Sequence, residues 1–233
     1  MGNIDYFSFH RVAEYFPQLL SRLHITLIIA VLSLCLGLLF GTLIAAVRLF
    51  NIPVLKQITS VYISFIRGVP VNIQLFIVYF GLPALLNPIF LKLGFDLNRL
   101  GAFCFVIITY TFNSAAFLSV VVTAAIQGVD KAQLEGAHSI GMTRWQMFRR
   151  IVSPQAFHVA IPEFGNTVIS TLKDTSLAFT VGVIDMVGVI SSIAARTRHS
   201  LEGYVGAAII YFVFCIILEK GFSLLEKKLQ IYR

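Results

Sequence analysis

Charged residues are scarce in this chain: Asp, Glu, Lys and Arg make up 12% of its 233 residues, about half of their share in an average soluble domain. Hydrophobic residues make up 58%, and the mean hydropathy is +0.85. One soluble core cannot enclose that much apolar surface. The composition therefore predicts an all-α, polytopic membrane protein and leaves no room for a large soluble catalytic domain.

The side chains of common catalytic and metal sites are also sparse. The three cysteines lie in apolar stretches without the spacing of a disulfide or metal site. No His/Cys cluster has metal-ligand spacing, and no Gly-x-x-x-x-Gly-Lys-Ser/Thr phosphate loop is present. We therefore expect no metal site, no bound cofactor and no enzymatic activity in this chain.

Long uncharged stretches predict five transmembrane helices. They lie at about 23–47, 61–83, 101–126, 160–190 and 203–220. The fourth stretch is too long for one straight span, and Lys173, Asp174 and Thr175 interrupt it. This pattern indicates two half-helices that meet within the membrane, as occurs where backbone lines a cavity.

The basic residues between the spans predict an orientation, because Lys and Arg concentrate in cytoplasmic loops. An N-out, C-in chain places this majority inside: Arg48, Lys56, Arg67, Lys131, Arg144, Arg149, Arg150, Lys220, Lys227, Lys228 and Arg233. The smaller outer set is Arg11, Arg22, Lys92, Arg99, Arg196 and Arg198. We interpret 1–22 as an interfacial segment, 23–225 as a single transmembrane domain and 226–233 as a cytoplasmic tail.

Residues 129–158 are the most polar part of the chain. Their helix-forming runs are interrupted at Gly141 and are expected to end near Pro154. An ordinary solvated loop is the alternative, but a simple connector is usually much shorter. We expect a cytoplasmic helix–turn–helix.

Gly37 and Gly41 in the first span have Gly-x-x-x-Gly spacing, which allows another helix to approach closely. The alternative is that small residues are simply common in membrane helices.

The polar loop carries a recognisable pattern: Glu135-Gly136-Ala137, then Gly141, then Ile151 to Pro154. It resembles the E-A-A-x3-G-x9-I-x-L-P loop of ATP-binding cassette (ABC) importer permeases. The spacing matches throughout, and the departures are Gly136 for an alanine and Ser153 for the leucine.

Further runs resemble the polar amino acid uptake permeases within that family, the histidine, glutamine, arginine and cystine type. These runs are FIRGVP at 65–70, QLF at 74–76, GLP at 81–83, GMTRW at 141–145, PQA at 154–156 and LKDTSL at 172–177. A turn with Pro162, Gly165 and Asn166 belongs to the same pattern. The resemblance covers most of the chain from about residue 20.

This resemblance implies a type I ABC importer permease fold in the bacterial cytoplasmic membrane. The chain would form the solute path and pair with a second permease chain, itself or a paralogue. ATPase subunits would bind ATP and Mg²⁺, and an extracytoplasmic binding protein would deliver an amino acid. Closure of the ATPases would drive alternating access.

In the family, the second helix of the loop is the coupling helix, which docks on the ATPase. The residues that the resemblance assigns to coupling are Glu135, Gly136, Ala137, Gly141, Trp145, Phe148, Arg149, Arg150 and Pro154. Trp145, Phe148 and the two arginines make a suitable docking surface, and Glu135 would brace the hairpin. Alternatively, Trp145 anchors the membrane interface.

Intramembrane charges are the first candidates for the solute path. Lys173 and Asp174 point about 100° apart on a helix and lie beside Thr175; their alternative role is to pair with neighbouring helices. The weaker candidates are Asn72, Gln74 and Asn113. The role of Glu163, expected near the cytoplasmic face, is open.

Two features bear on the solute. Relatives often carry a Glu and an Arg where this chain has Val120 and Thr123. The run at 176–186 looks more like members that handle cystine and other sulfur amino acids.

The alternative functions are a non-transporting scaffold or receptor subunit and, less favoured, an ion-coupled carrier. An ion-coupled carrier is less favoured because this chain has no internal repeat.

Overall fold

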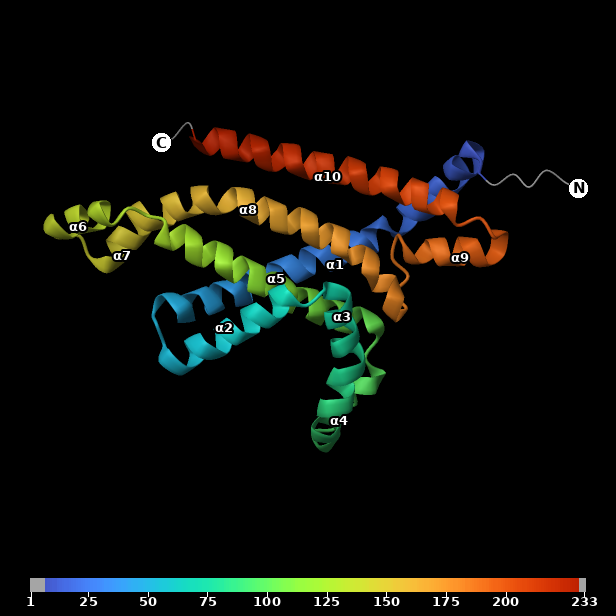
Figure 1. The fold of residues 1–233 in the computed structure, drawn as a ribbon, viewed down its shortest axis with the longest axis horizontal. Helices are drawn as coiled ribbons and strands as arrows, with labels where there is room; N and C mark the ends of the chain where they lie inside the picture. Colours follow the sequence, from blue (N-terminus) through green and yellow to red (C-terminus); the bar gives the residue numbers. More distant parts are fainter. Residues whose placement is uncertain (1–6, 231–233) are drawn as a thin grey trace, which may run out of the picture.

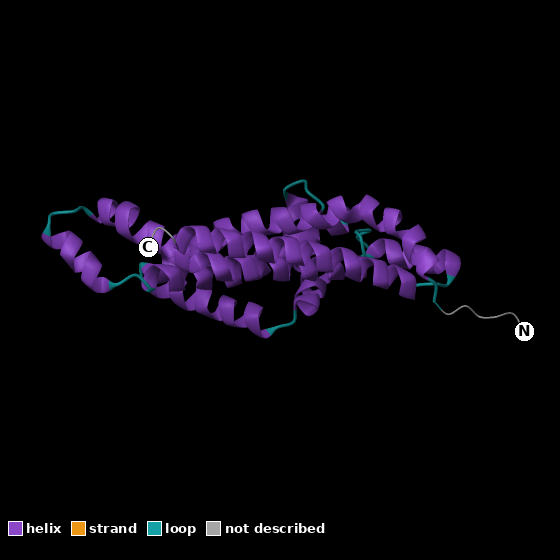
Figure 2. Ribbon diagram, turned by 90° about the horizontal axis from the view of Figure 1, so that it is seen from above, coloured by secondary structure: helices purple, strands orange, loops and turns teal. Residues whose placement is uncertain are grey.

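The computed structural model describes residues 7–230, and all regular elements in that range are helical (Figures 1 and 2). The α-helices are α1 (Phe9–Leu49), α2 (Pro53–Gly68), α3 (Val71–Phe76), α4 (Leu82–Lys92), α5 (Ala102–Gln127), α6 (Lys131–Ser139), α7 (Arg144–Met147), α8 (Ser153–Asp174), α9 (Gly188–Thr197) and α10 (Leu201–Gln230). Short segments of other helix types lie between some of them. Two are π-helical, η1 (Ile77–Gly81) and η3 (Phe148–Val152), and two are 3₁₀-helical, η2 (Leu97–Arg99) and η4 (Thr175–Val181). The predicted all-α class is confirmed.

Four helical stretches between residues 7 and 230 are long and apolar enough to cross a membrane. They are Phe9–Leu49, Val71–Lys92, Ala102–Gln127 and Leu201–Leu229. The polytopic character is therefore confirmed, while the count of five spans and the N-out orientation stay predictions.

Helices α1, α5, α8 and α10 run along the long axis of the molecule and form its core bundle (Figure 1). The α6–α7 hairpin lies at the same end of the bundle as the last turns of α10, and α9 lies at the opposite end with the start of α1 (Figure 1). Helices α3 and α4 point away from the bundle (Figure 1).

The closest packing in the bundle joins α1 to α5 at the two glycines of the Gly-x-x-x-Gly pair. A Cβ atom on Gly37 would lie 2.6 Å from Cβ of Ser114, and one on Gly41 would lie 2.9 Å from the carbonyl oxygen of Ala115. Both distances are far below ordinary van der Waals contact. The spacing therefore reflects a close helix approach rather than a general abundance of small residues.

Within the described residues, the first and last helices extend further toward the chain ends than expected. Helix α1 passes through Pro17 and residue 22 without a break, because Val12, Tyr15 and Leu19 pack in the core and Arg11 pairs with the buried Glu202 at 2.8 Å. Helix α10 likewise continues beyond residue 220 to Gln230. Residues 1–6 of the predicted interfacial segment and 231–233 of the predicted tail lie outside the described residues.

The second span, predicted at 61–83, is not one continuous helix. Helix α2 ends at Gly68, Val69 and Pro70 are extended, and α3 begins at Val71. Proline has no N–H group and favours an extended conformation in the residue before it. These two properties interrupt the helix in the middle of an apolar stretch.

The break expected in the fourth span is present where Lys173, Asp174 and Thr175 predicted it. Helix α8 ends at Asp174, the chain tightens into the 3₁₀ turns of η4, and Gly182 closes them with φ +89°. Pro162, Gly165 and Asn166 were expected at a turn, but they lie within α8.

We predict that Gly37→Ala and Gly41→Ala destabilise the protein by about 1–3 kcal/mol each, because the added methyl group meets α5. Gly221→Ala is the matched control, since a Cβ atom there meets nothing within 4 Å. Thermal unfolding in detergent should show lower midpoints for the two α1 variants and an equal or higher midpoint for the control. Equal midpoints for all three variants would contradict a tight α1–α5 contact.

Candidate functional site

Two regions carry the residues that the sequence singled out. One is the α6–α7 hairpin at one end of the bundle (Figure 1), and the other is a polar pocket between α2, α5 and α8.

Local capping explains why the hairpin folds. Asp130 caps α6 by accepting from the N–H of Ala132 at 2.9 Å. Thr143 and Gln146 form a reciprocal capping box at the start of α7, at 3.3 and 2.9 Å. Gly141 turns the chain between the helices with φ +79°, a conformation that favours glycine.

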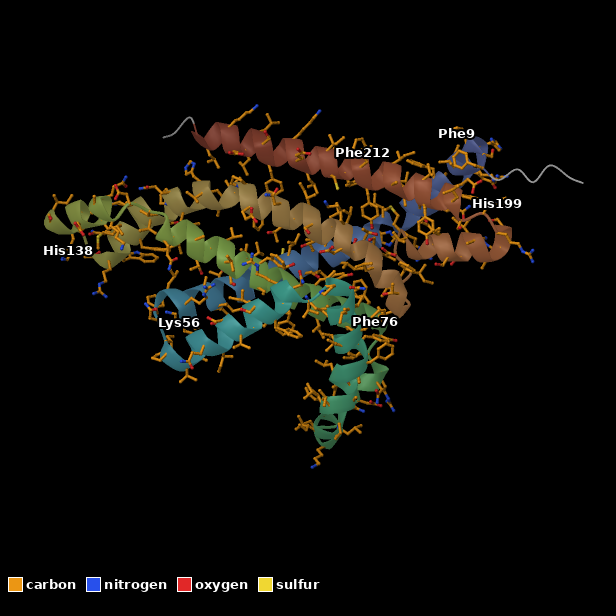
Figure 3. All side chains as sticks on the ribbon, in the orientation of Figure 1. Phe9, Lys56, Phe76, His138, His199 and Phe212 are labelled. Carbon is orange, nitrogen blue, oxygen red and sulfur yellow. The ribbon has the colours of Figure 1, made fainter. Side chains whose placement is uncertain are left out.

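The hairpin presents an aromatic and basic surface. Trp145 is 67% exposed and stacks on Phe148, with ring centroids 5.9 Å apart. Arg144, Arg149 and Arg150 are exposed beside them. The hairpin projects from the bundle near the labelled His138 (Figure 3), so these side chains are accessible to a partner.

The other α6 residues assigned to coupling differ in their surroundings in the hairpin. The side chain of Glu135 is exposed, and the observed helix caps come from Asp130 and Thr143 instead. Ala137 is buried. A Cβ atom on Gly136 would meet nothing within 4 Å, so glycine in place of the family's alanine has no steric cause.

The expectation that the second hairpin helix ends near Pro154 is wrong. Helix α7 passes through the wide turn η3 directly into α8, and Pro154 lies in the first turn of α8. Such π-type turns shift the hydrogen-bond register, so the helix accommodates a residue that lacks an N–H group. The hairpin is also joined to α8 by a 2.6 Å bond from Gln155 to Gln133.

A pocket of 360 Å³ lies between the end of α2, the middle of α5 and one face of α8. Its polar and charged lining residues are Arg67, Asn113, Glu163, Asn166, Thr167, Ser170, Thr171 and Asp174. Arg67, one of the basic residues predicted on the cytoplasmic side, lines this pocket with its guanidinium 5.6 Å from the ring centroid of Phe117. The pocket therefore combines one cation with two carboxylates.

A larger pocket of 610 Å³ lies at the base of the hairpin, between the start of α8 and the end of α10. It includes Pro154, Pro162 and Leu229. Of these two pockets, only the smaller is lined by both an arginine and carboxylate side chains.

Helix α8 contributes its polar residues from one face. Glu163, Asn166, Ser170 and Asp174 follow at intervals of three or four residues, which is the spacing of neighbours on a helix surface. This periodicity was available in the sequence. It was missed because Pro162 and Gly165 were interpreted as a turn.

The structure separates the predicted solute-path residues into three groups. Asn113 and Asp174 line the pocket. Lys173 and Asn72 are exposed and are not among its lining residues. Gln74 is buried against the α2–α3 break, and Thr175 is also buried.

Buried hydroxyl groups satisfy the backbone at the end of α8. The Tyr110 hydroxyl donates to the carbonyl oxygen of Asp174 at 2.7 Å. The Thr175 hydroxyl donates to the carbonyl oxygen of Leu172 at 2.6 Å. These bonds hold the helix end, and with it the backbone of Asp174, against α5.

The positions where relatives often carry charges do not line the pocket. Thr123 is buried and donates to the carbonyl oxygen of Ser119 at 2.7 Å, and Val120 packs near Ile63 and Ile66. In this chain, these positions contribute to helix packing.

The loop pattern and the helical architecture both have counterparts among known proteins. Residues 33–231 match the family described as binding-protein-dependent transport system inner membrane component. The chain belongs to this family. The resemblance drawn from the loop and its flanking motifs is confirmed.

Curated relatives cover nearly the whole chain. The L-cystine transport system permease protein TcyL of Bacillus subtilis (strain 168) is 42% identical over 224 residues, which are 96% of this chain and 92% of TcyL. The arginine transport system permease protein ArtQ of the same organism is 32% identical over 228 residues, which are 98% of each chain.

A solved structure agrees with the fold. The crystal structure of an amino acid ABC transporter with histidines superposes on this chain with a TM-score of 0.83 and 32% sequence identity. The match covers 95% of this chain and 99% of the chain in that structure. This chain is therefore the permease subunit of an amino acid ABC importer, with the type I fold, in the inner membrane. Membership in the family implies ATPase and binding-protein partners.

We predict that Tyr110→Phe lowers the stability of this permease by about 1–3 kcal/mol, because it leaves the buried carbonyl group of Asp174 without its donor. Tyr204→Phe is the matched control: Tyr204 is 48% exposed, whereas Tyr110 is 1% exposed. The detergent-solubilised subunit should melt at a lower temperature only in the Tyr110 variant. A Tyr110 variant as stable as the Tyr204 variant would show that this bond does not hold the end of α8.

Proposed function

We propose that this permease carries a polar amino acid, most specifically cystine or another sulfur amino acid, along a path that includes the pocket between α2, α5 and α8. A partner ATPase binds ATP and Mg²⁺ and hydrolyses the nucleotide. A second permease chain, identical or related, completes the path, and an extracytoplasmic binding protein delivers the solute. Transport follows alternating access.

The observation that carries this proposal is the charge distribution of the pocket. Arg67 offers a planar guanidinium, which suits a carboxylate. Asp174 and Glu163 offer carboxylates, which suit an ammonium group. An amino acid at neutral pH carries one group of each kind, so the pocket matches the part that all amino acids share.

The sulfur preference rests on similarity. TcyL, a permease protein of an L-cystine system, is 42% identical to this chain, compared with 32% for the arginine system protein ArtQ. Cystine also carries two ammonium and two carboxylate groups, and these can engage Arg67 together with both Asp174 and Glu163.

Coupling to the ATPase is assigned to the hairpin. Exposed aromatic and arginine side chains are the usual anchors of protein interfaces. Trp145, Phe148 and the neighbouring arginines form such a group. Because α7 runs into α8, a force on this surface acts directly on the helix that lines the pocket.

We predict that Asp174→Asn lowers uptake about tenfold or more, because a hydrogen bond to a charged group is worth about 1.5–3 kcal/mol. Lys173→Gln is the matched control on the adjacent exposed residue and should leave uptake within about twofold of wild type. Uptake into proteoliposomes is measured with a panel of labelled amino acids, L-cystine first. Equal uptake by both variants would remove Asp174 from the solute path.

We predict that Trp145→Ala combined with Arg149→Ala uncouples transport, since hot-spot truncations at interfaces cost about 2 kcal/mol or more. Co-purification of the ATPase and uptake should both fall. Phe50→Ala combined with Lys56→Ala is the control, because these residues are exposed outside the hairpin. Normal ATPase recruitment and normal uptake in the hairpin variant would exclude this surface as the docking site.

A further inference from the structure

The break between α2 and α3 leaves the backbone carbonyl groups of Ile66 and Val69 without helical donors. Pro70 has no N–H group and cannot donate to Ile66, four residues earlier. The N–H of Ile73 would donate to Val69 in a continuous helix, but it donates to the carbonyl oxygen of Pro70 at 3.0 Å. Ile66 is buried, and buried carbonyl groups need a donor.

Gln74 supplies both missing donors. Its side chain is 4% exposed, and Nε2 donates to the carbonyl oxygens of Ile66 at 2.8 Å and Val69 at 2.7 Å. An amide nitrogen carries two hydrogens, so one side chain satisfies both groups. Because carbonyl oxygens only accept, the amide must face them with its nitrogen.

The other end of the same amide reaches α5. Oε1 of Gln74 accepts from Nδ2 of Asn113 at 3.1 Å. Asn113 lines the pocket, and Phe117, one helical turn further along α5, lies against the guanidinium of Arg67. Gln74 therefore connects the end of α2, which carries Arg67, to the part of α5 that faces the pocket.

We propose that Gln74 is a positioning residue for the solute pocket: it fixes the α2–α3 break against α5, so that Arg67 and Asn113 face the solute from defined places. Gln74 itself does not contact the solute. The proposal rests on the assignment of the pocket to the solute path, and it gives a buried glutamine in an apolar segment a role that Asn72, two residues away and exposed, does not share.

The first test uses the reconstituted importer with its ATPase and binding protein, and labelled L-cystine as the probe. Gln74→Glu keeps the size of the side chain but replaces the donor Nε2 with an oxygen that would face the carbonyl groups of Ile66 and Val69. Gln74→Met removes all three hydrogen bonds of the amide, to Ile66, Val69 and Asn113. We expect solute transported per ATP hydrolysed to fall about tenfold in both variants. Asn72→Asp and Asn72→Met are the matched controls and should keep the wild-type ratio.

A second measurement does not depend on the solute. With Cys35 and Cys215 replaced by serine, one spin label on the native Cys104 of α5 and one on Ser64→Cys of α2 report the distance between the two helices. All four positions are outside the proposed contact. The distance distribution should shift or broaden in both Gln74 variants and stay unchanged in the Asn72 variants.

Pro70→Ala separates positioning from folding. In the Gln74→Met background it restores an N–H group that can donate to the carbonyl oxygen of Ile66, so the double variant should fold and assemble with the ATPase. The helix then straightens, and the low transport per ATP should persist. Two results for the double variant would overturn the proposal: recovered transport, or failure to assemble. Unchanged distances between the spin labels in the Gln74 variants would overturn it as well. A silent Asp174→Asn variant would instead overturn the solute assignment of the pocket, whatever the distances show.

Discussion

The need to satisfy backbone hydrogen bonds in apolar surroundings governs this structure, because membrane lipid offers no donors or acceptors. Where the helices are regular, the backbone satisfies itself. Where α2 and α8 end beside the pocket, side chains from other positions replace the missing partners: Gln74 at one break and Tyr110 at the other. Both breaks border the pocket, so the same bonds that make irregular backbone tolerable also determine where polar side chains face an internal space.

Close packing complements these bonds. Gly37 and Gly41 bring α1 against α5 at distances that exclude even a methyl group, and α5 in turn carries Tyr110 and Asn113 to the two breaks. Apolar side chains gain little by leaving lipid for a helix interface, so van der Waals contact between small residues adds cohesion that apolar burial does not supply. Helix α5 can therefore serve both breaks because its other face is held by α1.

The sequence predicted the parts of the fold that depend on local patterns. The hairpin follows from Gly141 and the family spacing, and the break at Lys173-Asp174-Thr175 from charges within an apolar stretch. Contacts between distant residues were not predictable: the 39-residue separation of Gln74 and Asn113 hid that Gln74 serves the backbone. Prolines were an unreliable guide to helix ends. Pro70 does interrupt a helix, but the helix continues through Pro154 and Pro162, where an end and a turn were expected.

The passage through Pro154 matters for how a partner's movement reaches the solute. A helix that ended there would leave the hairpin on a flexible joint. Instead, the helical path from Arg144 to Asp174 is continuous and about 45 Å long at about 1.5 Å per residue. With the hairpin docked on an ATPase as proposed, rotation of that helix moves Glu163, Asn166 and Ser170 together, since they share one face. The polar face of α8 then changes its relation to Arg67 as a unit, and this requires the end of α2 to stay fixed on α5.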